Sequence, residues 1–544
     1  MKNKEYPYYD VPEMSDLKEM VWNKAKTMPN KTAFVYPCES GEMKKTYQNL
    51  KDDINAYGTW MYSEGIKGKH VAIIGENSYE WLVAFLAATN GGNVAVAIDK
   101  NLPEEEQIAL ADIGEVELFL VTDSHVDKVK HGLKDGDSRK VYDLIDFNAM
   151  LKKGRTLITQ GDTDFINYEI VLDQTAAILF TSGTSGVSKG VELTHRSMAY
   201  DVVHTSMLYQ PDLDGGVVAI LPFHHAFGLV VAIFMVVNYG VPIYINKKIK
   251  QIKKDMEEFQ PQLMFMVPMF VEFFHKQIWK EIEKKGKTAV FRQLMNTTDA
   301  LLKTGIDVRS KTYKTVQNVF GGKLTEIICG GAALDPMYVK DFRSWGIEIL
   351  NGYGTTECSP VVAVNRPHHR KDGSVGKLVP GVKVKVTEDG EIAFKGDLVM
   401  KGYYKRPEDT DKVLIDGWYH TGDLGYVDEE DFIFLTGRKK NLIILSNGEN
   451  ISPEELEQNI ARDKGVQEVL VYDENSKIVA EIFPTEEYLG NTEYFEALKD
   501  KVNKGRPIYK QITKVRLRDE EFIKNASMKI VRHKNIPSYK EEER

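Results

Sequence analysis

Short β-branched runs alternate with helical patterns along much of the chain, and this alternation restricts the possible folds most. Runs such as His70–Ile74 and Leu118–Thr122 are separated by segments such as Ser78–Gly92, whose apolar spacing is helical. Such alternation is typical of a parallel sheet covered by helices. A second series of apolar runs follows Ile170: Ala176–Phe180, Gly215–Pro222, Gly240–Ile245, Leu263–Pro268 and Leu324–Gly331. We therefore expect two α-covered sheets of parallel type.

The pattern changes from about Ser374, where short strands are separated by Gly and Asp. The segments Glu388–Gly390 and Asp428–Asp431 are typical of hairpin turns, which predicts a small β subdomain. Further on, Ser452 is a predicted N-cap, Pro453 the first helical residue and Glu455 the capping-box partner.

The predicted fold class is α/β, with a large N-terminal domain of two α-covered sheets plus the small β subdomain. A small mobile α+β domain follows it. The expected boundaries are 1–437 and 438–544, with a hinge at 437–440.

Composition excludes several classes of protein. With 544 residues, 42% hydrophobic residues and a net charge of -9, the chain is an ordinary globular protein rather than a nucleic-acid binder. The three cysteines, Cys38, Cys329 and Cys358, form no zinc pattern and suit a reducing compartment. The longest apolar run, Ala226–Val237, is too short for a membrane span, so we expect a buried helix and a cytoplasmic protein without an integral membrane segment.

A loop rich in Ser, Thr and Gly follows the run Ala176–Phe180. It is not a Walker-type loop, because Ser188 precedes Lys189 and Gly190 follows it. Its hydroxyls, free backbone N–H groups and single cation are nevertheless suited to a polyphosphate, although such a loop is equally typical of a plain connection. The candidate phosphate-binding residues are Thr181, Ser182, Gly183, Thr184, Ser185, Gly186 and Lys189.

This loop resembles the phosphate loop of the adenylate-forming (AMP-binding) superfamily, which includes acyl-CoA synthetases, luciferases and the adenylation domains of peptide synthetases. The family pattern Thr-Thr-Gly-x-Pro-Lys-Gly is matched except that Ser185 replaces the second Thr and Ser188 the Pro. Further segments resemble family motifs in the same order along the chain: Leu221–Gly228, Cys329–Ala333, Asn351–Pro360, Gly417–Gly425 and Gly437–Glu457.

The resemblance implies a two-step reaction. A carboxylate attacks the α-phosphorus of ATP and releases pyrophosphate, and a thiol then displaces AMP. The implied cofactors are ATP, Mg²⁺ and CoA, or the phosphopantetheine of an acyl carrier protein in place of CoA. Because an anion must approach a polyanion in line, catalysis rests on charge and alignment.

The motif Asn351–Pro360 supplies the expected metal and adenine residues. The resemblance assigns Glu357 and Thr184 to the metal, Tyr353 to stacking on adenine and Thr356 to the α-phosphate. Taken alone, Glu357 could equally be an exposed loop residue and Tyr353 a packed one. The other residues assigned to the nucleotide are Gly331, Ala332, Ala333, Asn351, Gly352, Gly354 and Thr355.

Downstream motifs are assigned to the ribose. Asp423 is expected to accept both ribose hydroxyls, although a turn aspartate would have the same sequence context. Arg438 is expected to reach ribose or phosphate, the alternative being a surface arginine. Phe434 is expected to contact the nucleotide.

The C-terminal region is expected to supply the catalytic cation. The segment Ile523–Arg532 resembles the family's catalytic-lysine motif and places Lys529 at the lysine, with Lys524 and Lys534 as nearby competitors. Three motif positions differ, carrying Ile523, Asn525 and Met528. Lys440 matches the pivot on which the small domain turns between the two steps, and Gly448 and Glu449 are expected to face the thiol tunnel.

The pocket motif indicates an apolar acid. No acidic residue lies between Leu221 and Gly228, so the ammonium of an amino acid would be unpaired there. His224, His225 and Phe227 favour a fatty or aryl acid instead. His225 either orients the carboxylate, gates the channel or packs as an ordinary histidine.

The form of the hinge segment resembles bacterial long-chain acyl-CoA synthetases, which favours a medium- or long-chain fatty acid. We expect an acid–thiol ligase acting as a monomer or homodimer on a small carboxylic acid, with CoA as acceptor. The alternatives are an acyl-carrier-protein ligase and a non-catalytic relative that binds nucleotide or acyl groups.

Overall fold

The structure is a computed structural model that describes residues 7–38, 41–134, 136–181, 188–444, 450–474, 477–524 and 530–536. The chain divides into two compact units. The first comprises 1–384, 394–419 and 429–433, and the second 385–393, 420–428 and 434–544. The second unit thus takes two short pieces that precede the expected hinge, and the domain boundary at 437/438 stays a prediction.

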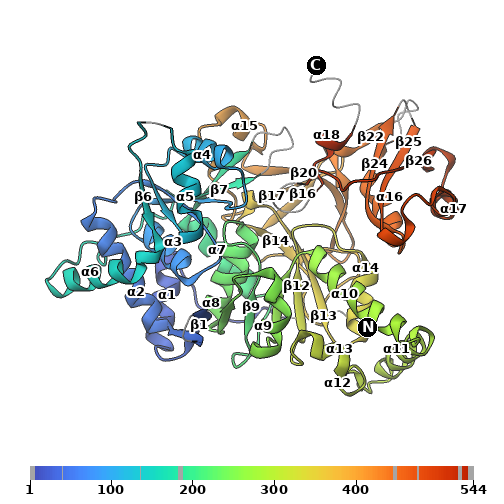
Figure 1. The fold of residues 1–544 in the computed structure, drawn as a ribbon, viewed down its shortest axis with the longest axis horizontal. Helices are drawn as coiled ribbons and strands as arrows, with labels where there is room; N and C mark the ends of the chain where they lie inside the picture. The colour runs from blue at the N-terminus through green and yellow to red at the C-terminus, as the bar shows by residue number, and fades with distance from the viewer. Residues whose placement is uncertain are drawn as a thin grey trace. The chain divides into compact units, whose positions relative to one another are not determined.

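The first unit contains a seven-stranded sheet in the order β18-β8-β7-β4-β3-β5-β6, of which β6 and β7 are labelled in Figure 1. The five strands from β7 to β6 run parallel, and β8 is antiparallel to β7. The strands are β3 (His70–Ile74), β4 (Val94–Ile98), β5 (Leu118–Val121), β6 (Lys140–Asp143), β7 (Thr175–Thr181), β8 (Lys189–Thr194) and β18 (Gly402–Tyr403).

Alternate residues of these strands face two different helical layers. On one face, strand residues such as Ala72 and Val96 pack against Ile108 and Val129 of α4 and α5, which lie side by side in Figure 1. Helix α3 packs against β3 and β4, and α2 packs along α6. The bounds are α2 (Tyr47–Ser63), α3 (Tyr79–Asn90), α4 (Glu104–Ile113), α5 (Asp123–Gly132) and α6 (Phe147–Thr159).

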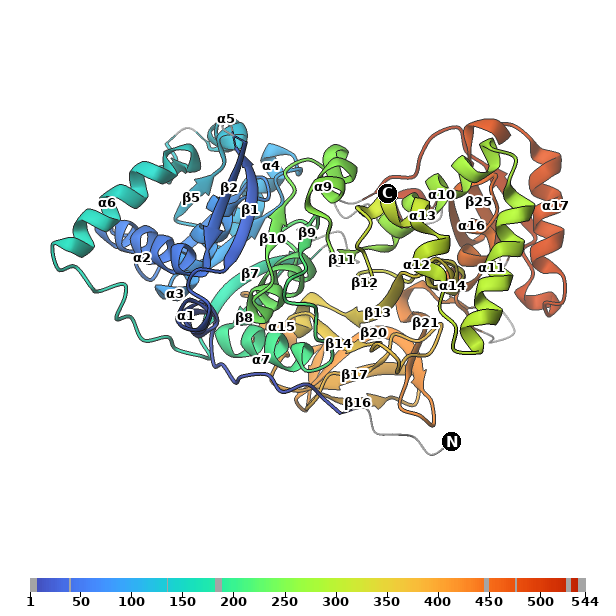
Figure 2. The ribbon, with the colours of Figure 1, turned by 90° about the horizontal axis from the view of Figure 1, so that it is seen from below.

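A nine-stranded sheet, in the order β15-β14-β13-β12-β11-β9-β10-β1-β2, forms the rest of the first unit's core. The six strands from β13 to β1 are parallel, and Figure 2 shows β1 and β2 beside β10. The strands are β1 (Thr32–Cys38), β2 (Gly41–Thr46), β9 (Val217–Ala219), β10 (Ile243–Ile245), β11 (Leu263–Met266), β12 (Glu326–Cys329), β13 (Glu348–Gly354), β14 (Val361–Val364) and β15 (Lys377–Leu378).

Two expected α-covered sheets of parallel type are thus present, but the division of strands between them was predicted wrongly. The run 176–180 was assigned to the second series, whereas β7 pairs with β4 in the first sheet. Conversely, the N-terminal strand β1 joins the second sheet. Alternation of strands and helices predicts parallel pairing, but it carries no information about sheet order.

The longest apolar run is a buried helix, as predicted. Residues Phe227–Met235 have π-helical hydrogen bonding, and α8 (Val236–Tyr239) continues the helix to Gly240, which adopts φ 84°. Helix α7 (His195–Ser206) packs against it. No helix in the described part of the chain is both long enough and apolar enough to cross a membrane.

Helices α9 to α14 connect and cover the second sheet. Helix α10 begins at Pro268, directly after β11, and packs against α11 and α14. The bounds are α1 (Leu17–Thr27), α9 (Ile252–Phe259), α10 (Pro268–Lys284), α11 (Thr288–Lys303), α12 (Arg309–Thr312), α13 (Lys314–Gln317) and α14 (Pro336–Ser344).

The predicted β subdomain is a small sheet in the order β16-β17-β20-β19, with β21 paired to β20. The expected turns join β16 to β17 and β20 to β21, and Gly390 adopts φ 83° in the first of them. The strands are β16 (Lys383–Val386), β17 (Glu391–Lys395), β19 (Leu414–Ile415), β20 (Trp418–Val427) and β21 (Ile433–Arg438), and α15 (Pro407–Asp411) precedes β19.

The C-terminal part of the second unit is α+β, as predicted. Sheet β24-β25-β26 packs on α16 and α17 around a core that includes Leu456, Val471 and Phe495. The bounds are α16 (Pro453–Ala461), β24 (Val466–Glu474), β25 (Lys477–Pro484), α17 (Thr492–Asn503), β26 (Lys514–Leu517) and α18 (Arg532–Asn535), with β22 (Ile443–Ile444) paired to β23 (Asn450–Ile451).

Pro453 is the first helical residue of α16, as predicted, but the capping box is absent. The Ser452 side chain makes no hydrogen bond to the helix backbone. Its hydroxyl instead donates to Oε2 of Glu454 at 2.7 Å.

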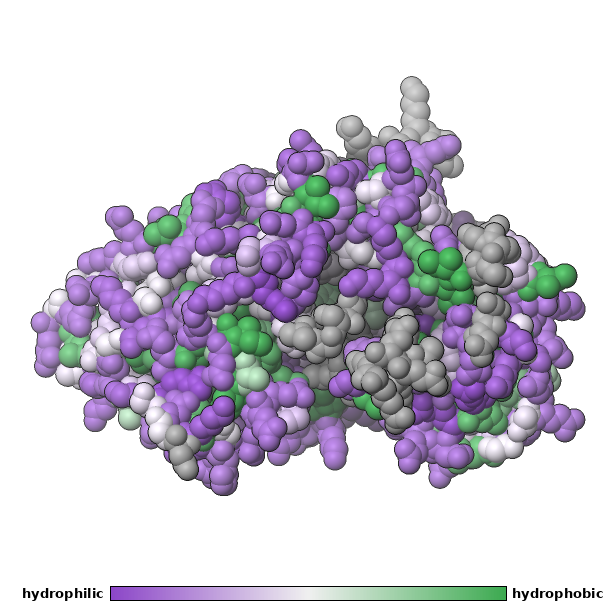
Figure 3. All heavy atoms as spheres, turned by 90° about the horizontal axis from the view of Figure 1, so that it is seen from above, coloured by the Kyte–Doolittle hydropathy of each residue, from purple (hydrophilic) through white to green (hydrophobic). Residues whose placement is uncertain are grey.

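Polar side chains predominate on the face shown in Figure 3, where apolar ones form separate small patches. All three cysteines are free thiols.

Candidate functional site

The carboxyl ends of both sheets of the first unit meet at the segment Leu221–His225. The side chain of Asn77, just after β3, donates from Nδ2 to the carbonyl of Leu221 at 2.8 Å and accepts at Oδ1 from the backbone N–H of Phe223 at 3.0 Å. Ligands of α/β proteins bind outside the carboxyl ends of the strands. The predicted pocket motif therefore occupies the expected edge.

His224 in this segment is paired with a carboxylate that the sequence pattern did not indicate. Its Nε2 lies 3.5 Å from Oδ2 of Asp99, at the end of β4, and the two side chains are only 8% and 7% exposed. Burial raises the pKa of Asp99, but the interaction with the nearby His224 and the backbone N–H of Asn101 outweigh it and lower that pKa to about 2. The pocket motif thus does contact an acidic residue, although none lies within it.

His225 and Phe227 are less buried than His224. The ring of Phe227 lies beside Gly330, since a Cβ built on that glycine would be 3.6 Å from Cζ of Phe227. Gly228 admits no side chain, because a Cβ there would lie 2.1 Å from the carbonyl oxygen of Pro222. The pocket motif and the glycine turn after β12 are therefore neighbours, and His225 stays a candidate for contact with the acid.

The turn after β12 presents the predicted adenine residues at the surface. Gly331, Ala332 and Ala333 are exposed, and Gly331 adopts φ 85°. In the adjacent β13, Asn351 pairs with Cys329 of β12. The residues predicted to surround adenine are thus brought together.

The end of β13 leads into the turn that carries Glu357. Gly354 must be glycine here, because a Cβ would lie 1.8 Å from the carbonyl oxygen of Pro360. The Thr355 backbone N–H donates to that same oxygen at 2.9 Å. Gly352 pairs with Val364 of β14.

Several buried polar atoms of β13 and of the turn after it lack hydrogen bonds. Among them, Oδ1 of Asn351, Oγ1 of Thr355 and Oγ of Ser359 make no hydrogen bond to any described residue. Buried polar atoms are rarely left unpaired, so each calls for a ligand or a water. The ring of Tyr353 lies 6.0 Å from that of Phe394 and is only partly buried, and Thr356 begins the short helix η5 (Thr356–Cys358).

Glu357, Tyr403 and Lys189 form one connected cluster. The Tyr403 hydroxyl donates to Oε1 of Glu357 at 2.8 Å. Nζ of Lys189 lies 4.7 Å from the centroid of the Tyr403 ring and 3.4 Å from Oδ1 of Asp409. Thr181 pairs with Lys189 across β7 and β8, so the two described ends of the predicted phosphate loop are adjacent.

Glu357 fits a role in holding Mg²⁺ on a nucleotide. Its side chain is buried, and among the described residues only Oε1 is hydrogen-bonded, which leaves Oε2 available. The described residues contain no group of three or more His, Cys, Asp or Glu that could hold a metal. Magnesium usually binds through one or two carboxylates together with substrate phosphates and waters, so a single carboxylate suffices.

Several predicted site residues lie outside the described part of the chain. These are Ser182, Gly183, Thr184, Ser185, Gly186, Gly448, Glu449 and Lys529.

In the second unit, the predicted ribose residues lie together. Nε of Arg438 is 2.7 Å from Oδ1 of Asp423, and the Asp423 side chain is 8% exposed against 49% for Arg438. Phe434 stacks on Tyr426 with ring centroids 5.0 Å apart. Asp423 is therefore a buried carboxylate rather than an exposed turn residue.

The predicted pivot, Lys440, directly follows a lysine that forms two ion pairs. Lys439 Nζ lies 2.5 Å from Oδ2 of Asp389 and 3.3 Å from Oε2 of Glu391. Hydrogen bonds to Asp389 and Glu391 raise the pKa of Lys439. Lys440 itself is exposed and lies in the short helix η6 (Lys439–Asn441).

The competitors of Lys529 differ in their surroundings. Lys524 is paired with Glu468 and with Glu521, the latter at 2.8 Å, whereas Lys534 is exposed. Lys524 also forms an isolated β-bridge with Ile530. The residues on either side of 525–529 are therefore anchored to each other, and Lys524 is already held by carboxylates.

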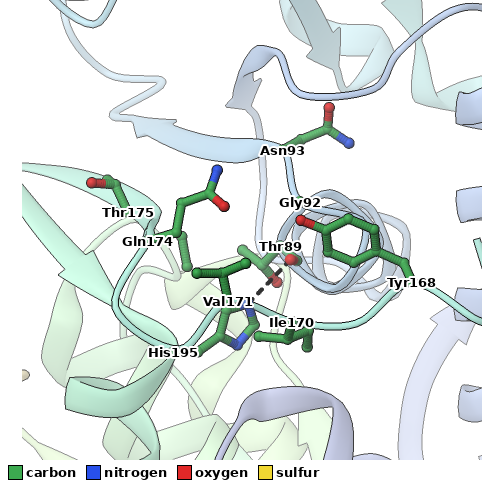
Figure 4. Close-up of a pocket in the computed structure, with 10 residues that line it drawn as sticks. Thr89, Gly92, Asn93, Tyr168, Ile170, Val171, Gln174, Thr175 and His195 are labelled. Atoms are coloured by element: carbon green, nitrogen blue, oxygen red, sulfur yellow. Dashed lines mark hydrogen bonds between the residues drawn. The ribbon is translucent and has the colours of Figure 1, made fainter.

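A different histidine, His195, lines the small hollow shown in Figure 4. Its Nε2 lies 3.1 Å from the carbonyl oxygen of Thr89 and its Nδ1 3.4 Å from the backbone nitrogen of Leu17. The hollow has a volume of only about 10 Å³, which is room for about one water. His195 is therefore a packed histidine with both ring nitrogens engaged.

Residues 21–404 match the family described as AMP-binding enzyme. The chain belongs to the AMP-binding enzyme family. This confirms the predicted family, and the fold is shared with solved structures of CoA-ligase type at TM-scores of 0.74 and 0.77.

Relatives of known name support the same placement. A long-chain fatty acid–CoA ligase of Yersinia pestis is 28% identical over 529 residues, covering 86% of this chain and 85% of its own length. One of Mycobacterium bovis is 26% identical over 488 residues, covering 85% and 81%. The o-succinylbenzoate CoA synthetase of Bacillus subtilis, solved with ATP and magnesium ion, has a TM-score of 0.74 at 22% identity, covering 95% of this chain and 99% of that one.

Proposed function

We propose that this AMP-binding enzyme is an AMP-forming acyl-CoA synthetase that activates an apolar carboxylic acid. The carboxylate attacks the α-phosphorus of ATP to give an acyl adenylate and pyrophosphate, and a thiol then takes the acyl group and releases AMP. The observation that carries the proposal is the cluster of Lys189, Tyr403 and Glu357. It joins a cation at the end of the phosphate loop to a buried carboxylate with one available oxygen.

Each part of the cluster has a task in the first step. Glu357, with Thr184, would hold Mg²⁺, which neutralises charge on the phosphates when it is bound. Lys189 forms an ion pair with Asp409 in this structure. When ATP binds, the ammonium of Lys189 would leave Asp409 and pair with a phosphate. Asn351 and Thr355, whose buried oxygens lack partners among the described residues, would hydrogen-bond to the nucleotide.

The second unit would complete the reaction. Asp423 and Arg438 would bind the ribose, and Lys529 would bridge the acid and the α-phosphate during adenylation. We propose that residues 438–544 turn about Lys440 between the two steps, which brings Gly448 and Glu449 to the thiol.

A medium- or long-chain fatty acid is the proposed substrate, with an aryl acid as the alternative. His225 and Phe227 lie at the edge where the sheets' carboxyl ends meet, and Phe227 is the first residue of the buried helix 227–235. The names of the curated relatives agree with a long-chain acid. Asp99 is already paired with His224, so we do not expect Asp99 to pair with the ammonium of an amino acid.

CoA is the proposed acceptor, and the phosphopantetheine arm of a carrier protein is the alternative because it presents the same thiol. We further propose that the enzyme is cytoplasmic, because ATP and CoA are available in the cytoplasm. We also propose that it acts as a monomer or homodimer.

Release of pyrophosphate across a panel of fatty, aryl and amino acids tests this function. We expect release only with an apolar acid present, followed by thioester formation when CoA or holo-carrier protein is added. Acid-independent release, or release with amino acids alone, would contradict the proposal.

A further inference from the structure

Tyr403 contacts both charged residues of the cluster, and neither contact is explained by packing alone. It lies on β18, far from both partners in sequence, and it is 7% exposed. Glu357 and Lys189 have their tasks from the proposed function, so any role of Tyr403 toward them rests on that function.

The hydroxyl of Tyr403 determines which oxygen of Glu357 is available. It donates to Oε1 at 2.8 Å in a buried setting, and no described residue donates to Oε2. A hydrogen bond to a charged group is stronger than one between neutral groups, so the carboxylate is held in one rotation.

The ring of Tyr403 helps to position the ammonium of Lys189. The ammonium lies 4.7 Å from the ring centroid, within the range of cation–π attraction. Asp409 is its other partner at 3.4 Å, and the charge of Lys189 contributes to lowering the pKa of Asp409 against the opposing effect of burial.

The backbone holds Tyr403 rigidly between its partners. Its position on β18 pairs with Val191 of β8, and its N–H donates to Oγ1 of Thr410 at 2.9 Å. The N–H of Met400 donates to the backbone carbonyl of Glu357 at 2.8 Å, which ties the same segment to the carboxylate's own turn. The tyrosine thus connects the strand after the phosphate loop to the turn after β13.

We propose that Tyr403 is a positioning residue for the nucleotide and its metal. Its hydroxyl fixes Oε1 of Glu357 and so directs Oε2 to Mg²⁺, and its ring holds the ammonium of Lys189 ready for a phosphate.

Two variants separate the two contacts. Tyr403→Phe removes the hydroxyl and keeps the ring, whereas Tyr403→Leu removes both. The matched control is Tyr404→Phe, which removes the next hydroxyl along the chain, one that donates to Glu115 at 2.6 Å outside the cluster. Each full-length variant is titrated with Mn²⁺ in the presence of α,β-methylene-ATP, and metal binding is read by electron paramagnetic resonance.

Tyr403→Phe should weaken Mn²⁺ binding about 10-fold, as expected for loss of a hydrogen bond to a charged group, with the affinity for the analogue alone unchanged. Tyr403→Leu should also weaken binding of the analogue alone, because the ammonium of Lys189 loses its contact with the aromatic ring. Tyr404→Phe should match the wild type in both titrations.

The outcomes distinguish this inference from the proposed metal site. Wild-type Mn²⁺ affinity in Tyr403→Phe, combined with lost affinity in Glu357→Gln, would overturn the positioning role and leave the metal site intact. Wild-type affinity in Glu357→Gln would overturn both.

Discussion

The guanidinium of Arg438 lies against the carboxylate of Asp423, with 2.7 Å between Nε and Oδ1. The carboxylate is almost fully buried. The backbone N–H of Asp423 donates to Oγ1 of Thr421 at 3.0 Å, which fixes the position of the residue. A carboxylate held in this way offers acceptors only, which suits a pair of ribose hydroxyls.

Replacement of Asp423 by Asn should therefore raise the KM for ATP about 10- to 100-fold, since a hydrogen bond to a charged group contributes about 1.5–3 kcal/mol. The kcat should change less. Steady-state kinetics with varied ATP measure the effect, and Glu429→Gln in the exposed turn after β20 is the control. An unchanged KM would argue against ribose binding by Asp423.

Lys529→Ala should nearly abolish formation of the acyl adenylate while sparing thioester formation from supplied adenylate. The charge that bridges the acid and the α-phosphate is needed in the first step only. Each half-reaction is assayed separately, with exposed Lys534→Ala as the matched control. Equal loss in both half-reactions would remove Lys529 from the proposed role.

Lys440→Pro should leave adenylation intact and reduce thioester formation. Proline fixes φ near -65°, whereas a pivot must change its backbone angles between two states. The two half-reactions are compared with those of Lys440→Ala, which retains backbone freedom. Thioester synthesis at the wild-type rate would contradict a pivot at this position.

The buried Asp99–His224 pair should make stability depend on acid pH. Asp99 has a pKa of about 2 in the folded chain, against about 3.9 in an unfolded one. Between these values the unfolded chain binds more protons, so the contribution of Asp99 is complete above about pH 4 and is lost as the pH falls through 2.

Asp99→Asn should accordingly cost about 2 kcal/mol near neutral pH and progressively less below pH 4. Thermal unfolding of wild type and variant from pH 6 to pH 3 measures this difference, and Asp146→Asn at an exposed site is the control. A difference in unfolding temperature that does not narrow with acidification would show that the pair is not coupled as described.

Local structure was predicted from the sequence more closely than strand pairing was. The run 70–74 is β3 with the same bounds, and the buried helix 227–239 falls on the predicted apolar run. By contrast, 215–222 was predicted as one strand, but β9 ends at Ala219. Its last residues leave the sheet because Asn77 holds the backbone of Leu221 and Phe223.

Contacts between distant residues could not be read from the chain. Asp99 meets His224, and Tyr403 meets Glu357, only because parallel strands bring their carboxyl ends to one edge and β18 adds to β8. Motif resemblance identified Glu357 and Lys189 but gave no reason to consider Tyr403. Spacing along the sequence predicts which element a residue joins, whereas sheet order decides what it contacts.

Transfer of oxygen from the acid to AMP tests the central claim most directly. The enzyme is incubated with ATP, CoA and a long-chain fatty acid labelled with ¹⁸O in its carboxylate, and the AMP is analysed by mass spectrometry. Attack of the carboxylate on the α-phosphorus leaves one labelled oxygen in AMP when the thiol takes the acyl group, and this is the predicted result. Unlabelled AMP, or label in inorganic phosphate together with ADP, would contradict it.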